Sequence, residues 1–204
     1  MKRPGKIVCV GRNYVEHAKE LGNDVPTEPL IFLKPPSSVI REGEAIVLPP
    51  RSMDVQFEGE IGVVVGATLK RATPETARAA IASLVAANDV TARDLQRSDG
   101  QWTRAKGFDT FCPLGEPANV PGDLSVVTVV TRVNGQERQR ARASEMVFAI
   151  PTLIAFISGI MTLEPGDLVL TGTPAGVGTL SPGDEVEVEL LGLSRVRNAV
   201  RRES

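Results

Sequence analysis

The sequence predicts a strand-dominated α+β fold, and three observations support this prediction. Strand-like segments outnumber helix-like segments and do not alternate with them regularly, which argues against a doubly wound α/β fold. The tripeptide Pro-Gly-Asp occurs three times, and glycine after proline favours a type II turn in which the glycine has a positive φ. Asn134 and Gly135, between two strand-like runs, favour a type I′ turn and so predict a hairpin.

The remaining elements follow from local patterns. Short runs of β-branched residues between turn residues predict strands over residues 7–10, 46–48, 57–65, 126–133, 136–140, 168–170, 185–190 and 196–200. Helices are expected over residues 14–21, 74–80 and 151–161. Thr73 and Pro74 are typical of the N-cap and first position of a helix, and Pro151 suggests a similar start. Because no repeat or linker interrupts it, the chain 1–204 is expected to form one β-rich domain.

Composition and charge limit the possible functions. The chain has 204 residues, of which 42% are hydrophobic and 24% charged, as in ordinary globular proteins. A net charge of −2 argues against nucleic-acid binding, and no apolar run approaches the roughly 20 residues that span a membrane. Cys9 and Cys112 lack the spacing of a disulfide framework or a metal site, so reduced thiols and a cytoplasmic location are expected.

Three acidic residues suggest a metal site. Glu58 and Glu60 flank one glycine in a strand-like run, so both side chains are expected on one side, with Cα atoms roughly 6.5–7 Å apart. The run after Glu60 is apolar, as in a buried strand, and Asp89 follows a second largely apolar run. Carboxylates this close repel each other unless a cation lies between them, and oxygen ligands suit Mg²⁺, Mn²⁺ or Ca²⁺. The alternative is a solvated acidic face, which is the usual role of paired glutamates on a strand.

The histidine of this chain lies in a segment with helix signals at both ends. Asn13 and Glu16 can form a capping box, and Gly22 can end the helix. Glu20 lies on the same helical face as His17, where it can hold one imidazole N–H and leave the other nitrogen as a general base. The alternative is an exposed histidine on an amphipathic helix, which is the more common arrangement.

Two further segments are candidates for binding an anion. Lys106, among aromatic residues, can stabilise a developing enolate, although most single lysines are solvated. Residues 172–178 follow a predicted strand and are rich in glycine, so their backbone N–H groups can surround an anion. They lack the Gly-Lys-Ser/Thr end of a P-loop. A carboxylate-binding loop or a plain tight turn is therefore expected in place of a nucleotide site.

Together these motifs resemble the fumarylacetoacetate hydrolase family, and most closely its short acylpyruvase and oxaloacetate decarboxylase branch. The matching segments are residues 8–14 followed by His17, 32–35, 58–64, 89–94, 102–103 with Lys106, 170–174 and 176–178. They cover nearly the whole chain in the order of the family. The resemblance implies a mixed β-roll, normally found as a homodimer. One departure is the stretch 95–102, which is shorter than in the animal enzymes of the family and implies a different pocket wall.

The resemblance also implies roles for individual residues. The implied ligands of Mg²⁺ or Mn²⁺ are three carboxylates: Glu58, Glu60 and Asp89. The implied catalytic residues are a water-activating dyad on a lid-like element and a lysine near the reacting carbonyl: His17, Glu20 and Lys106. The implied contacts to the carboxylate or keto end of the substrate, besides Lys106, are Arg12, Gln96 and Thr173.

The activity implied by the resemblance is metal-dependent cleavage of a C–C bond in acylpyruvates or related 2-oxo (di)acids, with decarboxylation of oxaloacetate as a related reaction. Both reactions produce an enolate that a metal ion stabilises as a Lewis acid. The alternative enzyme is an isomerase or decarboxylase of 2-hydroxyhepta-2,4-diene-1,7-dioate, a hydroxy-diene-dioate of aromatic degradation. A non-enzymatic alternative is a β scaffold that its metal ion only stabilises, although such a scaffold has no use for the dyad of His17 and Glu20.

Overall fold

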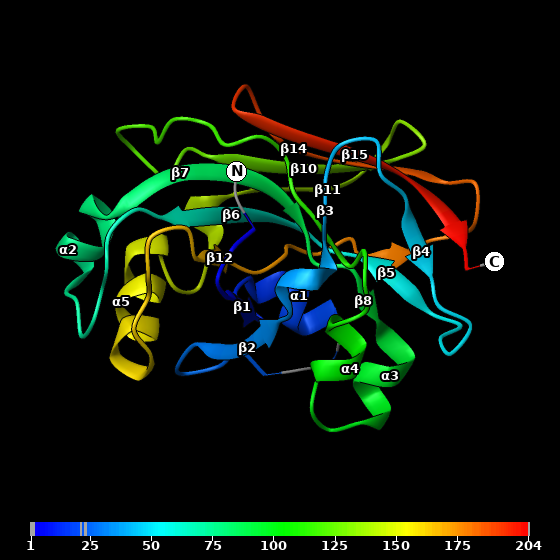
Figure 1. The fold of residues 1–204 in the computed structure, drawn as a ribbon, viewed down its shortest axis with the longest axis horizontal. Coiled ribbons are helices and arrows are strands. Elements are labelled where there is room, and N and C mark those ends of the chain that lie inside the picture. The colour runs from blue at the N-terminus through cyan, green and yellow to red at the C-terminus, as the bar shows by residue number, and fades with distance from the viewer. Residues whose placement is uncertain (1–2, 21, 23, 204) are drawn as a thin grey trace.

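Strands dominate the computed structural model, which describes residues 3–20, 22 and 24–203 (Figure 1). Two five-stranded sheets make up most of the fold, and a three-stranded and a two-stranded sheet complete it. The predicted strand-dominated α+β class is therefore confirmed. Among the described residues, no helix has the length and apolar character needed to cross a membrane.

The first large sheet supplies most of the candidate site. Its order is β2 (Leu30–Lys34), β1 (Ile7–Gly11), β12 (Leu168–Leu170), β6 (Gly59–Val65) and β7 (Ile81–Asn88). Strands β1 and β12 are parallel, whereas the other neighbours are antiparallel, so the sheet is mixed. Hydrophobic clusters cover both of its faces, and every residue of β6 is buried. This explains why the β6 sequence lacks polar alternation.

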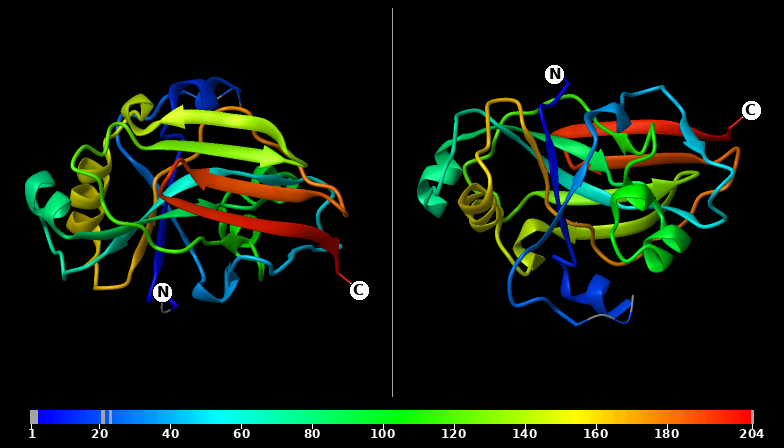
Figure 2. Two further views of the ribbon diagram at one scale, coloured as in Figure 1. Left: turned by 90° about the horizontal axis from the view of Figure 1, so that it is seen from above. Right: turned by 60° about the horizontal axis from the view of Figure 1, so that its bottom comes forward.

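The second large sheet has one face exposed. Its order is β11 (Gln136–Arg142), β10 (Thr128–Val133), β14 (Glu185–Leu190), β15 (Ser194–Arg202) and β4 (Ile46–Leu48). The four longer strands lie side by side in Figure 2. Asn134 and Gly135 join β10 to β11 with φ of 52° and 76°, as the predicted type I′ turn requires. Buried and exposed residues alternate along β15, as expected of a strand with one solvated face.

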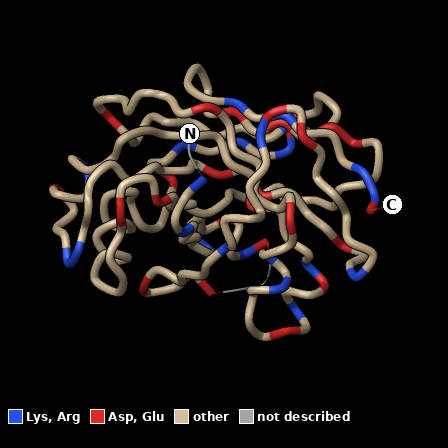
Figure 3. The backbone as a smooth tube through the Cα atoms, in the orientation of Figure 1, with Lys and Arg blue, Asp and Glu red and all other residues tan. Residues whose placement is uncertain are grey.

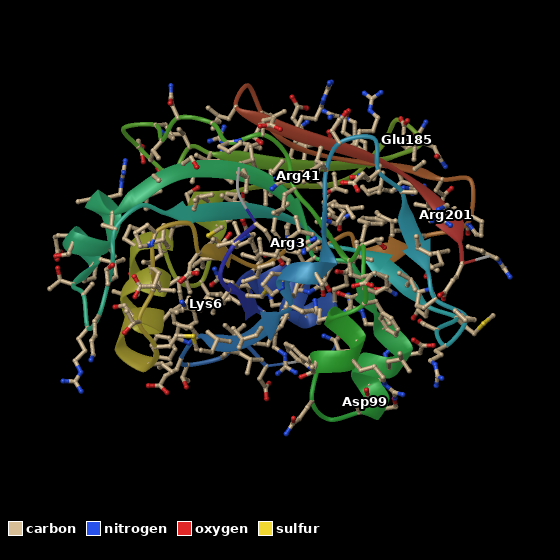
Figure 4. All side chains as sticks on the ribbon, in the orientation of Figure 1. Arg3, Lys6, Arg41, Asp99, Glu185 and Arg201 are labelled. Atoms are coloured by element: carbon tan, nitrogen blue, oxygen red, sulfur yellow. The ribbon has the colours of Figure 1, made fainter. Side chains whose placement is uncertain are left out.

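Charged residues of both signs are mixed along the chain (Figure 3). On the second sheet, Arg132 of β10 pairs with Glu187 and Glu189 of β14. Figure 4 places Glu185 and Arg201 on this sheet and Asp99 on the opposite side of the molecule, beside α3 (Arg93–Ser98). These cross-strand pairs offset charges of opposite sign on neighbouring strands of the sheet.

The main core lies between the two large sheets. Val8, Val63 and Leu84 of the first sheet belong to one cluster with Val129 and Val188 of the second. Helix α5 (Ile150–Ile160) packs against the same cluster, and α2 (Pro74–Ala79) lies beside α5 (Figure 1). The core thus holds the two sheets and α5 together and makes the first sheet a rigid base for the site.

The helix signals around the two prolines are confirmed. In α2, Pro74 occupies the first turn, and the side chain of Thr73 accepts a hydrogen bond from the N–H of Thr76. In α5, Pro151 also lies in the first turn. Proline suits this position because the first N–H groups of a helix have no partner within the helix.

The smaller elements lie around the site. They are α1 (Val15–Glu20), α4 (Thr103–Lys106), β3 (Val39–Ile40), β5 (Val55–Phe57), β8 (Thr91–Ala92), β9 (Cys112–Pro113), β13 (Gly178–Thr179) and the 3₁₀ helices η1 (Pro36–Ser38) and η2 (Ala143–Glu145). Helices α1, α3 and α4 all lie on the side of the first sheet away from the second (Figure 2). Neither α3 nor α4 was predicted, since each is too short for helical periodicity to show.

Several local predictions are wrong. The predicted capping box at α1 does not form, because the Asn13 side chain donates to Phe148 O and Thr171 O and accepts from Phe148 N. The predicted strand 57–65 is divided at residue 58, between β5 and β6. Of the three Pro-Gly-Asp turns, only those with Gly166 and Gly183 have the expected positive φ, and the one at residue 122 does not. Residue 21, the predicted end of α1, lies outside the described residues.

Candidate active site

Strand pairing brings the three predicted metal ligands together. Gly59 at the start of β6 faces Asn88 at the end of β7, and the Asp89 N–H donates to Glu58 O at 2.8 Å. Glu58, Glu60 and Asp89 are all buried, and one carboxylate oxygen from each lies within 4.8 Å of the others. Three buried anions this close repel one another strongly, so positive charge must lie nearby.

Three buried cations supply much of this charge. Lys106 Nζ donates to Glu58 Oε2 and Asp89 Oδ2, both at 2.7 Å, and lies 5.0 Å from the centre of the Phe32 ring. Lys34 Nζ donates to Asp89 Oδ1 at 2.7 Å. Arg93 Nη2 donates to the second oxygen of Glu58. Glu58 and Asp89 are therefore both paired on each carboxylate oxygen.

Ionisation in this cluster follows the pairing. Burial opposes the charged form of Glu58, but Lys106 and Arg93 together outweigh it and lower the pKa of Glu58. Burial likewise opposes the charged form of Lys106, yet Asp89 and Glu58 outweigh it and raise the pKa of Lys106. The lysine is thus held as an ammonium ion against two carboxylates.

Glu60 has no cationic partner among the described residues. Its Oε2 accepts one hydrogen bond, from Gly172 N at 2.7 Å. Burial, together with the charges of Asp89 and Glu58, raises the pKa of Glu60. A dication between these carboxylates would supply the missing positive charge, and an all-carboxylate oxygen set suits a hard cation. The residues therefore fit a divalent metal ion.

The predicted dyad lies on the short helix α1. His17 is buried, and its Nδ1 lies 3.3 Å from Glu20 Oε2, so the alternative of an exposed histidine is wrong. Burial lowers the pKa of His17, against the opposing effects of Glu58 and Glu20. Glu20 also accepts hydrogen bonds from the N–H of Gly176, at 3.0 and 3.2 Å. This contact attaches α1 to the loop after β12, two of whose N–H groups donate to the side chains of Glu60 and Glu20. Binding of a substrate anion by this loop stays a prediction.

All residues predicted to act on substrate or metal line one cavity of about 360 Å³. They are Arg12, His17, Glu20, Glu58, Glu60, Asp89, Gln96, Lys106 and Thr173. The size of the cavity suits a small organic acid and lies at the lower end of the range for ligand pockets. The cavity therefore brings together residues from five separate parts of the chain.

The three predicted substrate contacts differ in their surroundings. Arg12 has a φ of 58°, a conformation uncommon for residues other than glycine and often found at functional sites. The Oε1 atom of Gln96 accepts from Arg93, which leaves its amide nitrogen as a donor. The Thr173 hydroxyl is already engaged, because it donates to Gly59 O and accepts from Gln139.

Two site residues, Lys34 and Arg93, were not assigned a role from the sequence. Both belong to segments that matched the family, but a single lysine or arginine in a short segment usually lies at the surface. Their burial beside Asp89 and Glu58 is the signal that assigns them to the site. That signal depends on tertiary structure and is absent from local sequence.

The fold and the cavity are those of an enzyme with a candidate metal centre. Residues 6–201 match the family model described as "Fumarylacetoacetate (FAA) hydrolase C-terminal". The chain is 44% identical over 195 residues to "Oxaloacetate decarboxylase, mitochondrial" of Dictyostelium discoideum, covering 92% of this chain and 89% of that protein. It is also 44% identical over 211 residues to the human "Oxaloacetate tautomerase FAHD2A, mitochondrial", covering 97% and 67%.

A solved structure agrees with these relatives. A 5-carboxymethyl-2-hydroxymuconate delta-isomerase from Mycobacterium smegmatis superposes with a TM-score of 0.92 and 44% identity, covering 99% of this chain and 80% of that one. The chain therefore belongs to the fumarylacetoacetate hydrolase family. Its named relatives are enzymes, so we set the non-enzymatic scaffold aside.

Proposed function

We propose that this protein binds Mg²⁺ or Mn²⁺ through Glu58, Glu60 and Asp89 and cleaves a C–C bond of a small 2-oxo acid, either an acylpyruvate or oxaloacetate. One observation carries the proposal: Glu60 is buried beside two other carboxylates at the cavity, and it forms no ion pair among the described residues. A structural ion would not need a cavity of about 360 Å³ with a histidine dyad on its wall.

The substrate is held by groups that line the cavity. Arg12 and Gln96 bind the carboxylate or keto end, and the ion, when bound, acts as a Lewis acid on the keto oxygen. Lys106 has three N–H donors, of which Glu58 and Asp89 take two. The third can donate to the enolate oxygen as the C–C bond breaks, and such preorganised charge is usually the largest catalytic term.

Hydrolysis and decarboxylation differ in what they require of His17. For an acylpyruvate, His17 Nε2 takes a proton from water, because Nδ1 faces Glu20. The water oxygen bonds to the distal carbonyl carbon, the C–C bond breaks, and its electron pair forms the pyruvate enolate, which is then protonated. Oxaloacetate loses CO₂ to give the same enolate, and no nucleophile is needed.

A second candidate is isomerisation of a hydroxy-diene-dioate or tautomerisation of oxaloacetate. The similarity to the delta-isomerase and to the human tautomerase favours it. These reactions move a proton between carbon atoms or between carbon and oxygen, and His17 with Glu20 can serve as the proton relay. They leave every C–C bond intact, so product analysis separates them from cleavage.

The proposal also covers the domain organisation, the oligomeric state and the location of the protein. We expect residues 1–204 to act as one catalytic domain, as a homodimer, in the cytoplasm. Free, buried Cys9 and Cys112 support a reducing compartment. Exposed Leu30 and Leu33 on β2, an edge strand of the first sheet, support association with a second copy. Sedimentation equilibrium should give twice the mass of 21.8 kDa, and a monomer would contradict this part of the proposal.

A panel of substrates tests the proposed function. Acetylpyruvate, oxaloacetate and a hydroxymuconate-type diene should be assayed with Mg²⁺ or Mn²⁺, and the products identified by nuclear magnetic resonance. Cleavage of either 2-oxo acid, lost in chelator, supports the proposal. Isomerised diene or enol–keto exchange without cleavage supports the second candidate. No turnover of any of them would contradict both.

A further inference from the structure

Gln139 is a buried glutamine on a strand whose other side chains are mostly exposed. Only 1% of its surface is exposed, although it lies in β11, an edge strand of the second sheet. Burying an amide without partners is costly, so a buried glutamine must find hydrogen bonds. Its side-chain partners lie outside β11 and its paired strand β10. They are Gly59, between Glu58 and Glu60, and the loop after β12.

The side chain of Gln139 joins these two segments. Its Oε1 accepts from Gly59 N at 3.0 Å, and its Nε2 donates to Thr173 Oγ1 and Pro174 O, both at 2.8 Å. Thr173 Oγ1 in turn donates to Gly59 O at 2.9 Å. These hydrogen bonds form a closed ring. Each N–H or O–H of the ring has one acceptor, so the Gln139 amide has one orientation. Such a network is strong only while every member is satisfied.

The position of Gly59 shows how close this contact is. Gly59 separates the proposed ligands Glu58 and Glu60. A Cβ atom at this position would lie 1.9 Å from Thr131 Oγ1 and 3.2 Å from Gln139 Oε1. The second sheet therefore contacts the backbone between the two ligands so closely that only glycine fits.

The ring also restricts what Thr173 can do. A hydroxyl group has one proton, and that of Thr173 is directed to Gly59 O because Gln139 Nε2 donates to its oxygen. Thr173 therefore has no hydroxyl proton for a bound anion while the ring is intact. Its contribution to substrate binding depends on where the ring holds the loop backbone.

We propose that Gln139 is a positioning residue, which holds the Glu58–Glu60 backbone and the Thr173–Pro174 loop in one fixed arrangement. The inference rests on the proposed function, because it takes the loop as a wall of the substrate site. Gln139 acts through Gly59 and Thr173 and touches no reacting atom. A glutamine whose only role was to form hydrogen bonds with buried polar groups would affect stability and leave ligand affinity unchanged.

Gln139→Met and Thr173→Val test this inference, because each keeps side-chain volume and breaks the ring from a different end. The affinity for Mn²⁺ is measured by electron paramagnetic resonance and the affinity of the Mn²⁺-loaded protein for oxalate by calorimetry. Both variants should weaken oxalate binding about tenfold, as loss of a residue that orients ligands usually does. The double variant should be no weaker than either single variant, since one ring is broken once. Thr173→Ser keeps the hydroxyl and therefore the ring, so it should bind oxalate more tightly than Thr173→Val.

The matched control is Arg140→Gln on the same strand, because Arg140 is exposed and pairs with exposed Glu137. It should leave both affinities unchanged. Wild-type oxalate affinity in Gln139→Met and Thr173→Val, with only a lower melting temperature, would overturn the inference. If Gln139→Met does not fold, the oxalate affinities of Thr173→Val and Thr173→Ser are compared, and that comparison tests the inference. Oxalate binding can be measured without turnover. If the wild type is inactive but the variants bind oxalate more weakly than it does, the proposed function is rejected and this inference is kept.

Discussion

Lys106 Nζ lies 2.7 Å from Asp89 Oδ2 and donates a hydrogen bond to it. The residue expected near the reacting carbonyl is thus bound to a residue expected to hold the metal ion. A lysine in this position compensates the carboxylates in the protein without metal, and it repels a dication at the same site. The catalytic and metal-binding functions of the cluster are therefore coupled through one side chain.

Replacing Lys106 by Met should separate these two functions. We expect divalent affinity to rise at least about tenfold, because like charges a few ångströms apart repel by several kcal/mol in a protein site. Turnover should fall at the same time, since the enolate loses a donor. Titration with Mn²⁺ and steady-state kinetics measure the two effects. Arg104→Met on the same helix is the control, because Arg104 is exposed and pairs with Asp99, outside the acidic cluster. Weaker metal binding in Lys106→Met would show that the lysine does not oppose the ion.

Lys34→Met should destabilise the protein without added metal. Lys34 is buried and pairs with Asp89 at 2.7 Å, and removing one partner of a buried pair costs about 3–5 kcal/mol. Urea denaturation measures the free energy of unfolding, and Mg²⁺ should restore part of it by replacing the lost charge. Lys19→Met removes an exposed pair with Glu16 and should cost less than about 1 kcal/mol. Equal losses in the two variants would mean that burial of the Lys34–Asp89 pair has no energetic consequence.

His17→Ala should distinguish the two cleavage reactions. Acylpyruvate hydrolysis should fall by about 10²–10⁴-fold, the usual contribution of a general base. Oxaloacetate decarboxylation should retain most of its rate, because that reaction needs no activated water. Parallel measurement of kcat for both substrates provides the test. A similar loss of both activities would reject the separate role of His17.

The pH dependence of hydrolysis should report His17. The base is the neutral imidazole, and burial lowers its pKa from the ordinary value of 6.5, so activity should persist below pH 6.5 and fall only at more acid pH. Glu58 and Glu20 face the imidazole and raise its pKa, whereas Arg93 lowers it. Glu20→Gln removes one of the raising groups and should move the acid limb of kcat/KM further down. An acid limb above pH 6.5, or one that Glu20→Gln leaves in place, would assign the base to another group.

Much of the fold and of the site arrangement was predictable because it is recorded in local patterns. The Asn134-Gly135 turn, the prolines of α2 and α5, and the apolar run of β6 act over a few residues. The predicted site residues do line one cavity, although their roles remain proposals. Prediction from local patterns fails where partners distant in sequence compete for the same groups.

Asn13 illustrates this failure. Its sequence context favours a helix cap, yet its side chain binds backbone groups 135 and 158 residues away in the chain. Lys34 and Arg93 are a second case, because burial beside carboxylates changes what an ordinary surface charge does. The spacing of residues in the sequence does not show that β2 and α3 lie beside Asp89 and Glu58. Tertiary packing determines the partners of these residues.

The most direct measurement is oxaloacetate turnover by the wild type and Glu60→Gln, in chelator and after addition of Mg²⁺. Glu60 forms no ion pair among the described residues and accepts a hydrogen bond from Gly172 N. The Glu60→Gln variant keeps the shape of the side chain while losing its charge. The wild type should lose activity in chelator and regain it with Mg²⁺, whereas Glu60→Gln should stay at least about 100-fold less active, since even residues that only orient metal ligands contribute about 10–100-fold. Wild-type activity that persists in chelator, or a variant as active as the wild type, would contradict the metal-dependent mechanism.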